Sequence, residues 1–273
     1  MTKTKIPSKI YVALILLFLY LPMFIIMVLS FNSSNSTSVM QGFSFKWYFE
    51  LFKDSATIEA LKNTIVLAVT SSVTATVIGT MAAVGIDKMK KSWRKDTLIT
   101  VTNIPMMNPE IVTGVSMMLL FVFIGTALGI NGILGFWTLF IAHVTFCIPY
   151  VILNVMPKLK QTDIHLAEAA QDLGCTPFKA FFKVILPSIF PGVLSGLIMS
   201  FTLSLDDFII SYFVCGPKFQ TLPIRIFSMT KKRVTPDMYA LSTLIFVTIL
   251  VLLILVNVFQ DNNEQRKKGR VKK

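Results

Sequence analysis

The stretch "TDIHLAEAAQDLGCTPFKAFFKVILP", residues 162–187, lies between two long apolar runs and indicates how the chain is folded. Asp163 is placed to cap a first short helix, which we expect to end at Gly174 because glycine accepts the left-handed conformation that closes many helices. The Thr-Pro pair at 176–177 is a typical start for a second helix, which Pro187 is expected to stop. The pattern predicts a compact helix-turn-helix, although an ordinary amphipathic loop would share its periodicity.

The apolar runs on both sides are long enough to cross a bilayer, since a hydrocarbon core of ~30 Å needs about 20 helical residues. The chain is 54% hydrophobic and 15% charged, with a mean hydropathy of +0.70, so it has too little charge for the surface of a soluble domain of 273 residues. We therefore predict an all-α polytopic membrane protein. Six transmembrane helices are expected, at Tyr11–Phe31, Thr64–Ile86, Ile111–Ile130, Ile133–Leu153, Ile189–Val214 and Met238–Phe259.

The net charge of +12 is distributed as in a membrane protein and gives no reason to expect a nucleic-acid partner. Most Lys and Arg residues fall in segments that are cytoplasmic if both termini are cytoplasmic, including the tail "RKKGRVKK" at 266–273. One segment, 215–237, disagrees because it is basic and would be external. We keep the orientation with both termini in the cytoplasm, because the other loops agree with it.

Changes in composition divide the chain into three parts. Residues 1–62 hold the first span and an external loop, 63–260 form the membrane core with its loop at 162–187, and 261–273 form a basic cytoplasmic tail. The external loop contains an expected amphipathic helix in "SFKWYFELFKD", 44–54. Trp47 in this helix either anchors at the bilayer interface or presents its ring face to a cationic solute.

The third apolar region is expected to be broken. Residues 98–130 as one helix would measure ~50 Å, too long for a bilayer. The motif "NIPMMNPE" in its middle carries Pro105 and Pro109, and Asn108 with Pro109 and Glu110 suits a new helix start. Glu110 would then lie near mid-membrane, either neutralised by the dipole of its own helix or facing a water-filled cavity.

The fifth span contains two adjacent acids in "SFTLSLDDFIISYFV", 200–214. One helical face there carries small or polar residues, at Gly192, Gly196, Ser200, Ser204, Asp207 and Ser211. Small residues let helices approach closely, but they do not explain a carboxylate, which is costly inside a membrane. Asp206 and Asp207 have no basic residue in this span, so they suit a cation unless they are solvated caps at a helix end.

Other chemistry is weakly supported. Cys147, Cys175 and Cys215 fall on different sides of the expected membrane, so we expect neither disulfides nor a metal site. His143 and His165 show no nearby acid–nucleophile arrangement in the sequence, so we do not expect an enzyme. No G-x-x-x-x-G-K-[ST] pattern occurs, so this polypeptide lacks a nucleotide site of that type.

The lettering of the 162–187 loop, beyond its periodicity, resembles the EAA loop of ABC importer permeases. The matching residues are Glu168, Ala169, Ala170, Gly174, Leu186 and Pro187, while Val184 replaces the usual isoleucine. The resemblance implies that this loop docks a short helix into a groove of a separate ATPase subunit.

Nearly the whole chain is similar to PotC-type permeases of spermidine/putrescine ABC importers, through "FNSSNS", "QGFSFKWYFELF", "NIPMMNPEIVTGVSMMLLF", "EAAQDLGC" and "SFTLSLDDFIISYFVCGP". The resemblance implies a type I (MetI-like) permease fold in a bacterial cytoplasmic (inner) membrane. It also implies a related second permease (PotB-type), two ATPase subunits (PotA-type) that bind ATP and Mg, and an extracellular polyamine-binding protein (PotD-type). No cofactor is expected on this chain itself.

The same resemblance assigns the substrate path to Trp47, Glu110, Ser204, Asp206 and Asp207. The function it implies is a permease subunit that forms half of the path for polyamines and couples it to the ATPase. A permease of the same type for another cationic solute is an alternative. An ion-coupled secondary carrier, with the acids as coupling groups, is a less favoured one.

Overall fold

The computed structural model of the chain describes residues 6–34, 40–163, 165–217, 219–231, 236–248 and 250–251. The chain divides into two units, one formed by Met1–Ile58 with Ile226–Lys273 and the other by Glu59–Arg225. Each unit is described separately below.

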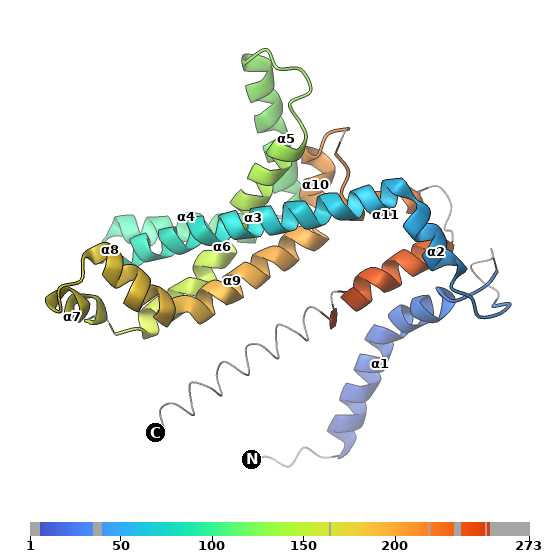
Figure 1. The fold of residues 1–273 in the computed structure, drawn as a ribbon, viewed down its shortest axis with the longest axis horizontal. Coiled ribbons are helices and arrows are strands. Elements are labelled where there is room, and N and C mark those ends of the chain that lie inside the picture. Colours follow the sequence, from blue (N-terminus) through green and yellow to red (C-terminus); the bar gives the residue numbers. More distant parts are fainter. Residues whose placement is uncertain are drawn as a thin grey trace. The chain divides into compact units, whose positions relative to one another are not determined.

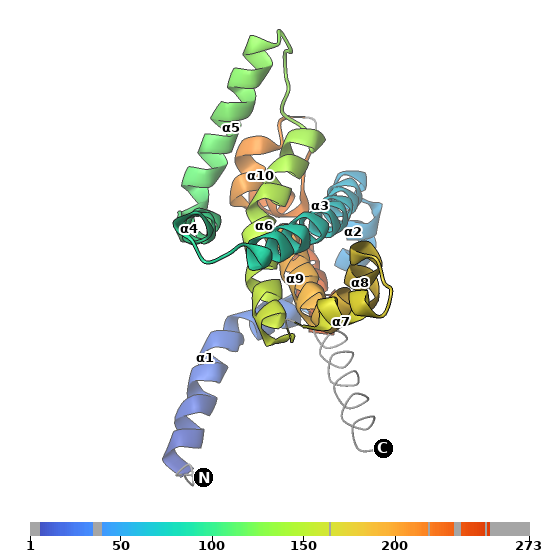
Figure 2. The ribbon, with the colours of Figure 1, turned by 90° about the vertical axis from the view of Figure 1, so that its left-hand side faces the viewer.

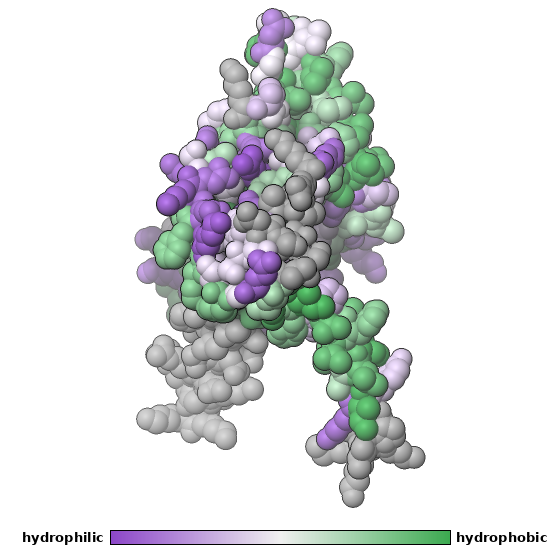
Figure 3. Space-filling view, turned by 90° about the vertical axis from the view of Figure 1, so that its right-hand side faces the viewer, coloured by the Kyte–Doolittle hydropathy of each residue, from purple (hydrophilic) through white to green (hydrophobic). Residues whose placement is uncertain are grey.

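The first unit begins with a long apolar helix, α1 (Ile6–Leu29). Its segment Lys9–Leu29 is long and apolar enough to cross a membrane, and none of its most apolar window is buried by the protein. The space-filling view shows a nearly continuous hydrophobic surface along this helix (Figure 3). Such a surface needs lipid or another protein around it, which supports the predicted first span.

A short aromatic-rich segment follows α1 and leads into α2 (Lys46–Lys53), the predicted amphipathic helix. Four rings pack against one another there, those of Phe31, Phe43, Phe45 and Tyr48. The hydroxyls of Ser30 and Tyr48 lie 2.7 Å apart and join the end of α1 to α2. The same unit contains helical residues 236–248 and 250–251, whereas most of the second half of the predicted sixth span, Met238–Phe259, lies outside the described residues.

The second unit contains the predicted broken helix. α3 (Ser55–Lys88) supplies the second span, and α4 (Trp93–Met107) and α5 (Glu110–Ala127) follow it. The break lies at Asn108 and Pro109, both in extended conformations, which confirms the prediction from "NIPMMNPE". The new helix differs by one residue from the expected start, because Pro109 rather than Asn108 is its N-cap and no side chain caps it.

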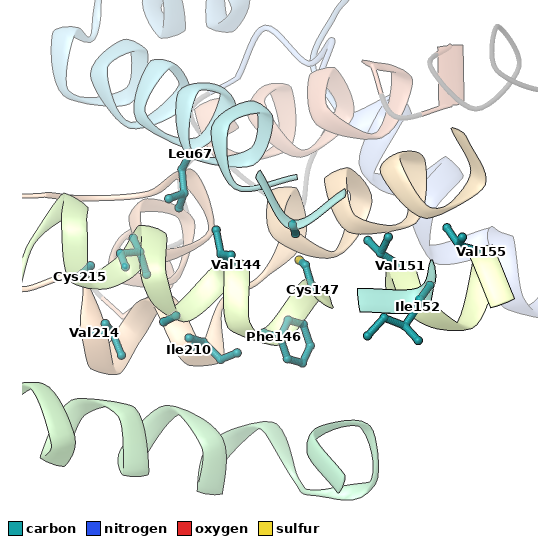
Figure 4. Packing of buried hydrophobic residues seen from close by; sticks show 14 of the residues in the cluster. Leu67, Val144, Phe146, Cys147, Val151, Ile152, Val155, Ile210, Val214 and Cys215 are labelled. Carbon is teal, nitrogen blue, oxygen red and sulfur yellow. The ribbon is translucent and has the colours of Figure 1, made fainter. Parts of the chain in front are cut away.

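The core of the second unit is built around α6 (Phe136–Gln161), and α9 (Leu186–Asp206) packs along it (Figure 1). Buried side chains of α6 such as Cys147 and Val151 form one cluster with Leu67 of α3 and Ile210 of the next helix, α10 (Ile209–Val214) (Figure 4). α5 lies beside α10 (Figure 2). Cys147, Cys175 and Cys215 are free cysteines.

The predicted stripe of small residues is the face that α9 buries. Gly192, Gly196, Ser200 and Ser204 are all buried. A Cβ atom on Gly192 would lie 2.8 Å from the carbonyl oxygen of Asn154, and one on Gly196 would lie 3.2 Å from the Cα of Val151. The backbones of α6 and α9 are therefore in close contact, as is typical where small residues line the interface between membrane helices.

A Gly192→Ala variant is expected to lower the stability of the protein by about 1–3 kcal/mol, because its new methyl group would meet a backbone oxygen that cannot rotate away. Gly85→Ala is the matched control: Gly85 is also helical, but no atom lies within 4 Å of its added Cβ. That control should gain up to about 1 kcal/mol. Thermal unfolding of both variants in detergent measures the difference, and equal unfolding temperatures would contradict the close packing.

The loop between α6 and α9 is a helix-turn-helix, but two details of the prediction are wrong. The helix α7 (Leu166–Asp172) starts later than expected, and the Asp163 side chain accepts the N–H of His165 at 3.0 Å instead of capping the helix. Pro187 does not stop the second helix, because α8 (Pro177–Ala180) continues through the π-helical segment η1 (Phe181–Ile185) into α9. In η1 the N–H of Leu186 bonds the carbonyl of Phe181, five residues earlier, which carries the helix past the missing N–H of the proline.

The predicted fifth span is also interrupted. Its helix ends at Asp206, Asp207 is extended, and α10 starts at Ile209. Among the described residues, five helices are long and apolar enough to span a membrane. The first four predicted spans coincide with four of these helices, except for a few residues at their ends. The fifth prediction is met by Pro177–Asp206, which ends at the aspartate pair instead of passing through it.

Candidate functional site

The break between α9 and α10 separates the two adjacent aspartates. The Asp207 side chain is turned inward, and 9% of the residue is exposed, whereas Asp206 is an exposed residue. The carboxylate of Asp207 accepts the N–H of Ile210 at 3.3 Å and that of Ser211 at 2.8 Å. It therefore satisfies donors that the first turn of α10 would otherwise leave free.

A second buried partner of Asp207 comes from α6. The Nε2 atom of His143 lies 3.5 Å from Asp207 Oδ2, and both side chains are almost completely buried. The expectation that both aspartates lack partners is thus wrong for Asp207. The structure also places an acid beside His143, which the sequence did not show, because periodicity within one span cannot reveal a residue on a neighbouring helix.

Each of the two helix breaks carries an exposed carboxylate, Glu110 after the first break and Asp206 before the second. Glu110 is the first residue of α5, and it lies close enough to Asp206 and to the hydroxyl of Tyr150 for electrostatic interaction. Gly114, one turn along α5, keeps this helix against α10: a Cβ on it would lie 3.4 Å from the carbonyl oxygen of Ile209. Two helix breaks therefore bring two exposed carboxylates into one neighbourhood.

Besides Asp207, two of the predicted path residues are buried. Ser204 is buried, and its hydroxyl lies 2.7 Å from His143 Nδ1 and 2.9 Å from Ser71 Oγ. Trp47 belongs to the other unit and is buried there, with its indole N–H donated to the carbonyl of Asn32 at 2.7 Å. The exposed rings of its helix are Phe49 and Phe52, so these rather than Trp47 are free to meet a bilayer interface.

The first helix of the protruding loop, α7, ends in a Schellman motif with a left-handed glycine. Gly174 has φ 87°, its N–H bonds the carbonyl of Gln171, and the N–H of Cys175 bonds the carbonyl of Ala170. This is the left-handed helix end expected at Gly174. The N-cap Thr176 then accepts the N–H of Lys179, as the Thr-Pro start predicted.

The predicted ATPase-coupling residues occupy both faces of this loop. Ala170 is buried, whereas Glu168, Ala169 and Gly174 are exposed. Leu186 and Pro187 lie where the loop joins α9, half-buried and exposed respectively. Glu168 Oε2 lies 3.1 Å from His165 Nδ1, and this hydrogen bond raises the pKa of His165. His165 therefore also has an acid beside it, on the surface.

Sequence reasoning missed two parts of the site. His143 was left without a role, although a polar ring in a span was a signal for a buried partner. Leu173 and Phe178 on the protruding loop are 87% and 74% exposed, which is unusual for large apolar side chains outside an expected bilayer. Their place beside the glycine turn was visible in the sequence, but their exposure was not.

These features define an integral membrane protein whose apolar helices carry two breaks with carboxylates and a protruding helical loop. Residues 75–269 match the family model for the binding-protein-dependent transport system inner membrane component. The chain belongs to this family, and the resemblance seen in the sequence is confirmed.

Curated relatives and solved structures agree with this assignment. The spermidine/putrescine transport system permease protein PotC of Escherichia coli (strain K12) is 38% identical over 258 residues, which are 93% of this chain and 94% of the relative. The putrescine transport system permease protein PotI of the same strain is 40% identical over 228 residues, 84% of this chain and 81% of the relative.

The fold is that of ABC importer permeases, as expected. A crystal structure of a bacterial ABC transporter involved in the import of the acidic polysaccharide alginate has a TM-score of 0.72 to this chain at 16% identity. It covers 94% of this chain and 93% of its own. At this identity the likeness concerns the fold and not the cargo.

Proposed function

We propose that this chain is a permease subunit of an ATP-driven importer of polyamines such as spermidine and putrescine. The observation that carries the proposal is the pair of exposed carboxylates, Glu110 and Asp206, brought together by two helix breaks in a chain related to PotC and PotI. A compact ammonium group is attracted by such carboxylates, and several ammoniums on one chain can meet carboxylates in series. The fold alone does not select this cargo, because the alginate importer has the same fold and an acidic cargo.

The importer that we propose needs partners that supply energy and substrate. A related second permease would complete the path, two ATPase subunits would bind ATP and Mg, and an extracellular binding protein would deliver the polyamine. The exposed Leu173 and Phe178 beside Gly174 support a docking role for the protruding loop, because an apolar surface of this kind suits a protein groove. With this role the loop would lie on the cytoplasmic side of an inner membrane, and the basic residues near both ends of the chain favour the same side for the termini.

Uptake by the reconstituted complex tests this proposal. The complex of this chain with the second permease, the ATPase and the binding protein is placed in liposomes, and uptake of labelled spermidine and putrescine is measured with ATP. We expect uptake that requires both ATP and the binding protein. Uptake driven by a proton or sodium gradient without ATP would overturn the proposal in favour of an ion-coupled carrier. ATP-driven uptake of a different cation would overturn the polyamine assignment alone.

A further inference from the structure

The buried imidazole of His143 contacts both sides of the break between α9 and α10. Its Nδ1 lies 2.7 Å from Ser204 Oγ in the last turn of α9. Its Nε2 lies 3.2 Å from Ser211 Oγ in the first turn of α10 and 3.5 Å from Asp207 Oδ2 between the two helices. One side chain of α6 therefore joins three points of a junction that no Pro or Gly marks in the sequence.

The junction depends on these contacts because a helix break leaves backbone groups without partners. The Asp207 carboxylate accepts two N–H groups of α10, but a buried carboxylate also needs a charged or polar donor beside it. When Asp207 is ionised, the proton on Nε2 of His143 is that donor, and Nδ1 shares the hydroxyl of Ser204. Replacing the ring by an apolar side chain would remove the donor from α6 and leave the buried carboxylate with donors of α10 alone.

The network reaches a further helix and is closed to solvent. Ser204 Oγ lies 2.9 Å from Ser71 Oγ, and Ser71 belongs to α3. Ser71, His143, Ser204 and Ser211 are all almost completely buried. A hydroxyl group can donate or accept a hydrogen bond. Ser204, supported by Ser71, can therefore pair with Nδ1 of His143 whichever ring nitrogen carries the proton. Four helices thus hold the junction in one geometry.

The register of this junction decides which aspartate is exposed. Successive residues of a helix point about 100° apart, so Asp206 and Asp207 cannot both continue the buried face of Ser200 and Ser204. On one continuous helix Asp207 would follow Ser200 and Ser204 on the buried face, and Asp206 would lie about 100° away from it. At the break Asp207 leaves the helical conformation, so helical periodicity no longer fixes its direction, and its contact with His143 holds it on that side instead.

We propose that His143 is a positioning residue, which fixes the break between α9 and α10 so that Asp207 is turned inward and Asp206 outward. The placement of the two carboxylates is independent of the proposed transport function. Only the role of the outward Asp206 in binding a cation rests on that function, so the placement and the role can be tested separately.

Cysteine labelling tests the placement without any substrate. Cys147, Cys175 and Cys215 are replaced in the assembled complex, a cysteine is introduced by Asp206→Cys, and its reaction with a small water-soluble thiol reagent is timed. We expect His143→Leu to lower the labelling rate severalfold, because a residue 206 that no longer faces outward is shielded from the reagent. Val151→Ala is the control, because Val151 is buried in the same helix and contacts Gly196 far from the break. A labelling rate that is equal in the His143→Leu and Val151→Ala backgrounds would overturn the proposal.

Two further variants separate positioning from general stability. His143→Gln keeps an amide donor at the place of Nε2, beside Asp207 and Ser211, whereas His143→Asn can reach only towards Ser204. With Asp206 intact, we expect the Gln variant to keep most of the substrate transported per ATP hydrolysed and the Asn variant to lower this ratio severalfold. A purely structural role would reduce the amount of assembled complex and leave the ratio per complex unchanged, which would overturn the proposal. If the labelling changes as expected but the complex carries no polyamine, the placement stands and the proposed function fails.

Discussion

An Asp206→Asn variant is expected to assemble like the wild type and to lose most of its substrate uptake. Asp206 is exposed at the end of α9, and no side chain among the described residues pairs with it in an ion pair that the structure records. Its charge therefore adds little to folding. If a cation binds there during transport, removing the charge should cost about 2 kcal/mol or more, or a roughly 30-fold fall in uptake.

An Asp207→Asn variant is expected to lose mainly stability and assembly, and less of its uptake. The Asp207 carboxylate accepts two N–H groups and faces His143, so an amide in its place presents an N–H₂ group to donors or to Nε2. We expect stability to fall by about 1–3 kcal/mol, with less assembled complex and a smaller loss of uptake per complex than in the Asp206→Asn variant. Thermal unfolding and uptake normalised to assembled complex distinguish the two variants.

Asp96→Asn provides a control for the loss of one negative charge, because Asp96 is exposed in the first turn of α4. Its uptake should remain normal. Normal uptake in the Asp206→Asn variant would contradict a binding role for that carboxylate. Equal stability losses in the Asp206→Asn and Asp207→Asn variants would contradict the division of the pair into an exposed and a buried member.

Much of the fold could be predicted because its signals are local. Apolar runs of sufficient length predict spans, and the spacing of Gly192, Gly196, Ser200 and Ser204 predicts the face that α9 buries. The break before Glu110 could be found because proline removes a donor at a known position. The left-handed end at Gly174 was predictable for a similar reason, since few other residues adopt that conformation.

The parts that could not be predicted depend on contacts between distant segments. No Pro or Gly lies near Asp207, so its helix break arises from capping by its own carboxylate and from His143 on another helix. Helical spacing places Asp207 on the face of small residues, but it shows neither the break nor the buried partner of Asp207 on another helix. The sequence suggested that Trp47 is exposed at an interface, but its indole N–H is donated to the carbonyl of Asn32, a contact that depends on how the intervening segment turns back. The π-helical turn before Pro187 likewise depends on how two helices join.

A Gly174→Leu variant is expected to insert and assemble in the membrane but to lose the coupling between ATP hydrolysis and uptake. Gly174 has φ 87°, a conformation that costs a residue with a Cβ about 1–2 kcal/mol, equivalent to a factor of roughly 5–30 in an equilibrium. No atom lies within 4 Å of an added Cβ, so the effect is conformational and not a collision. Relief of the strain would reorient Leu173 and the helix start at Thr176, which flank the turn.

Gly174→Asn is the matched control, because asparagine adopts the left-handed conformation more readily than leucine. Glu168→Lys tests the same surface by charge, since it reverses the charge of an exposed group that bonds His165. We expect substrate-stimulated ATP hydrolysis and uptake to fall about tenfold in the Gly174→Leu and Glu168→Lys variants and much less in Gly174→Asn. Capture of the ATPase by the purified permease pair reports docking directly. Wild-type uptake and wild-type ATPase capture in both the Leu and the Lys variants would show that this loop is not the docking element, because its turn and its charge would both be dispensable.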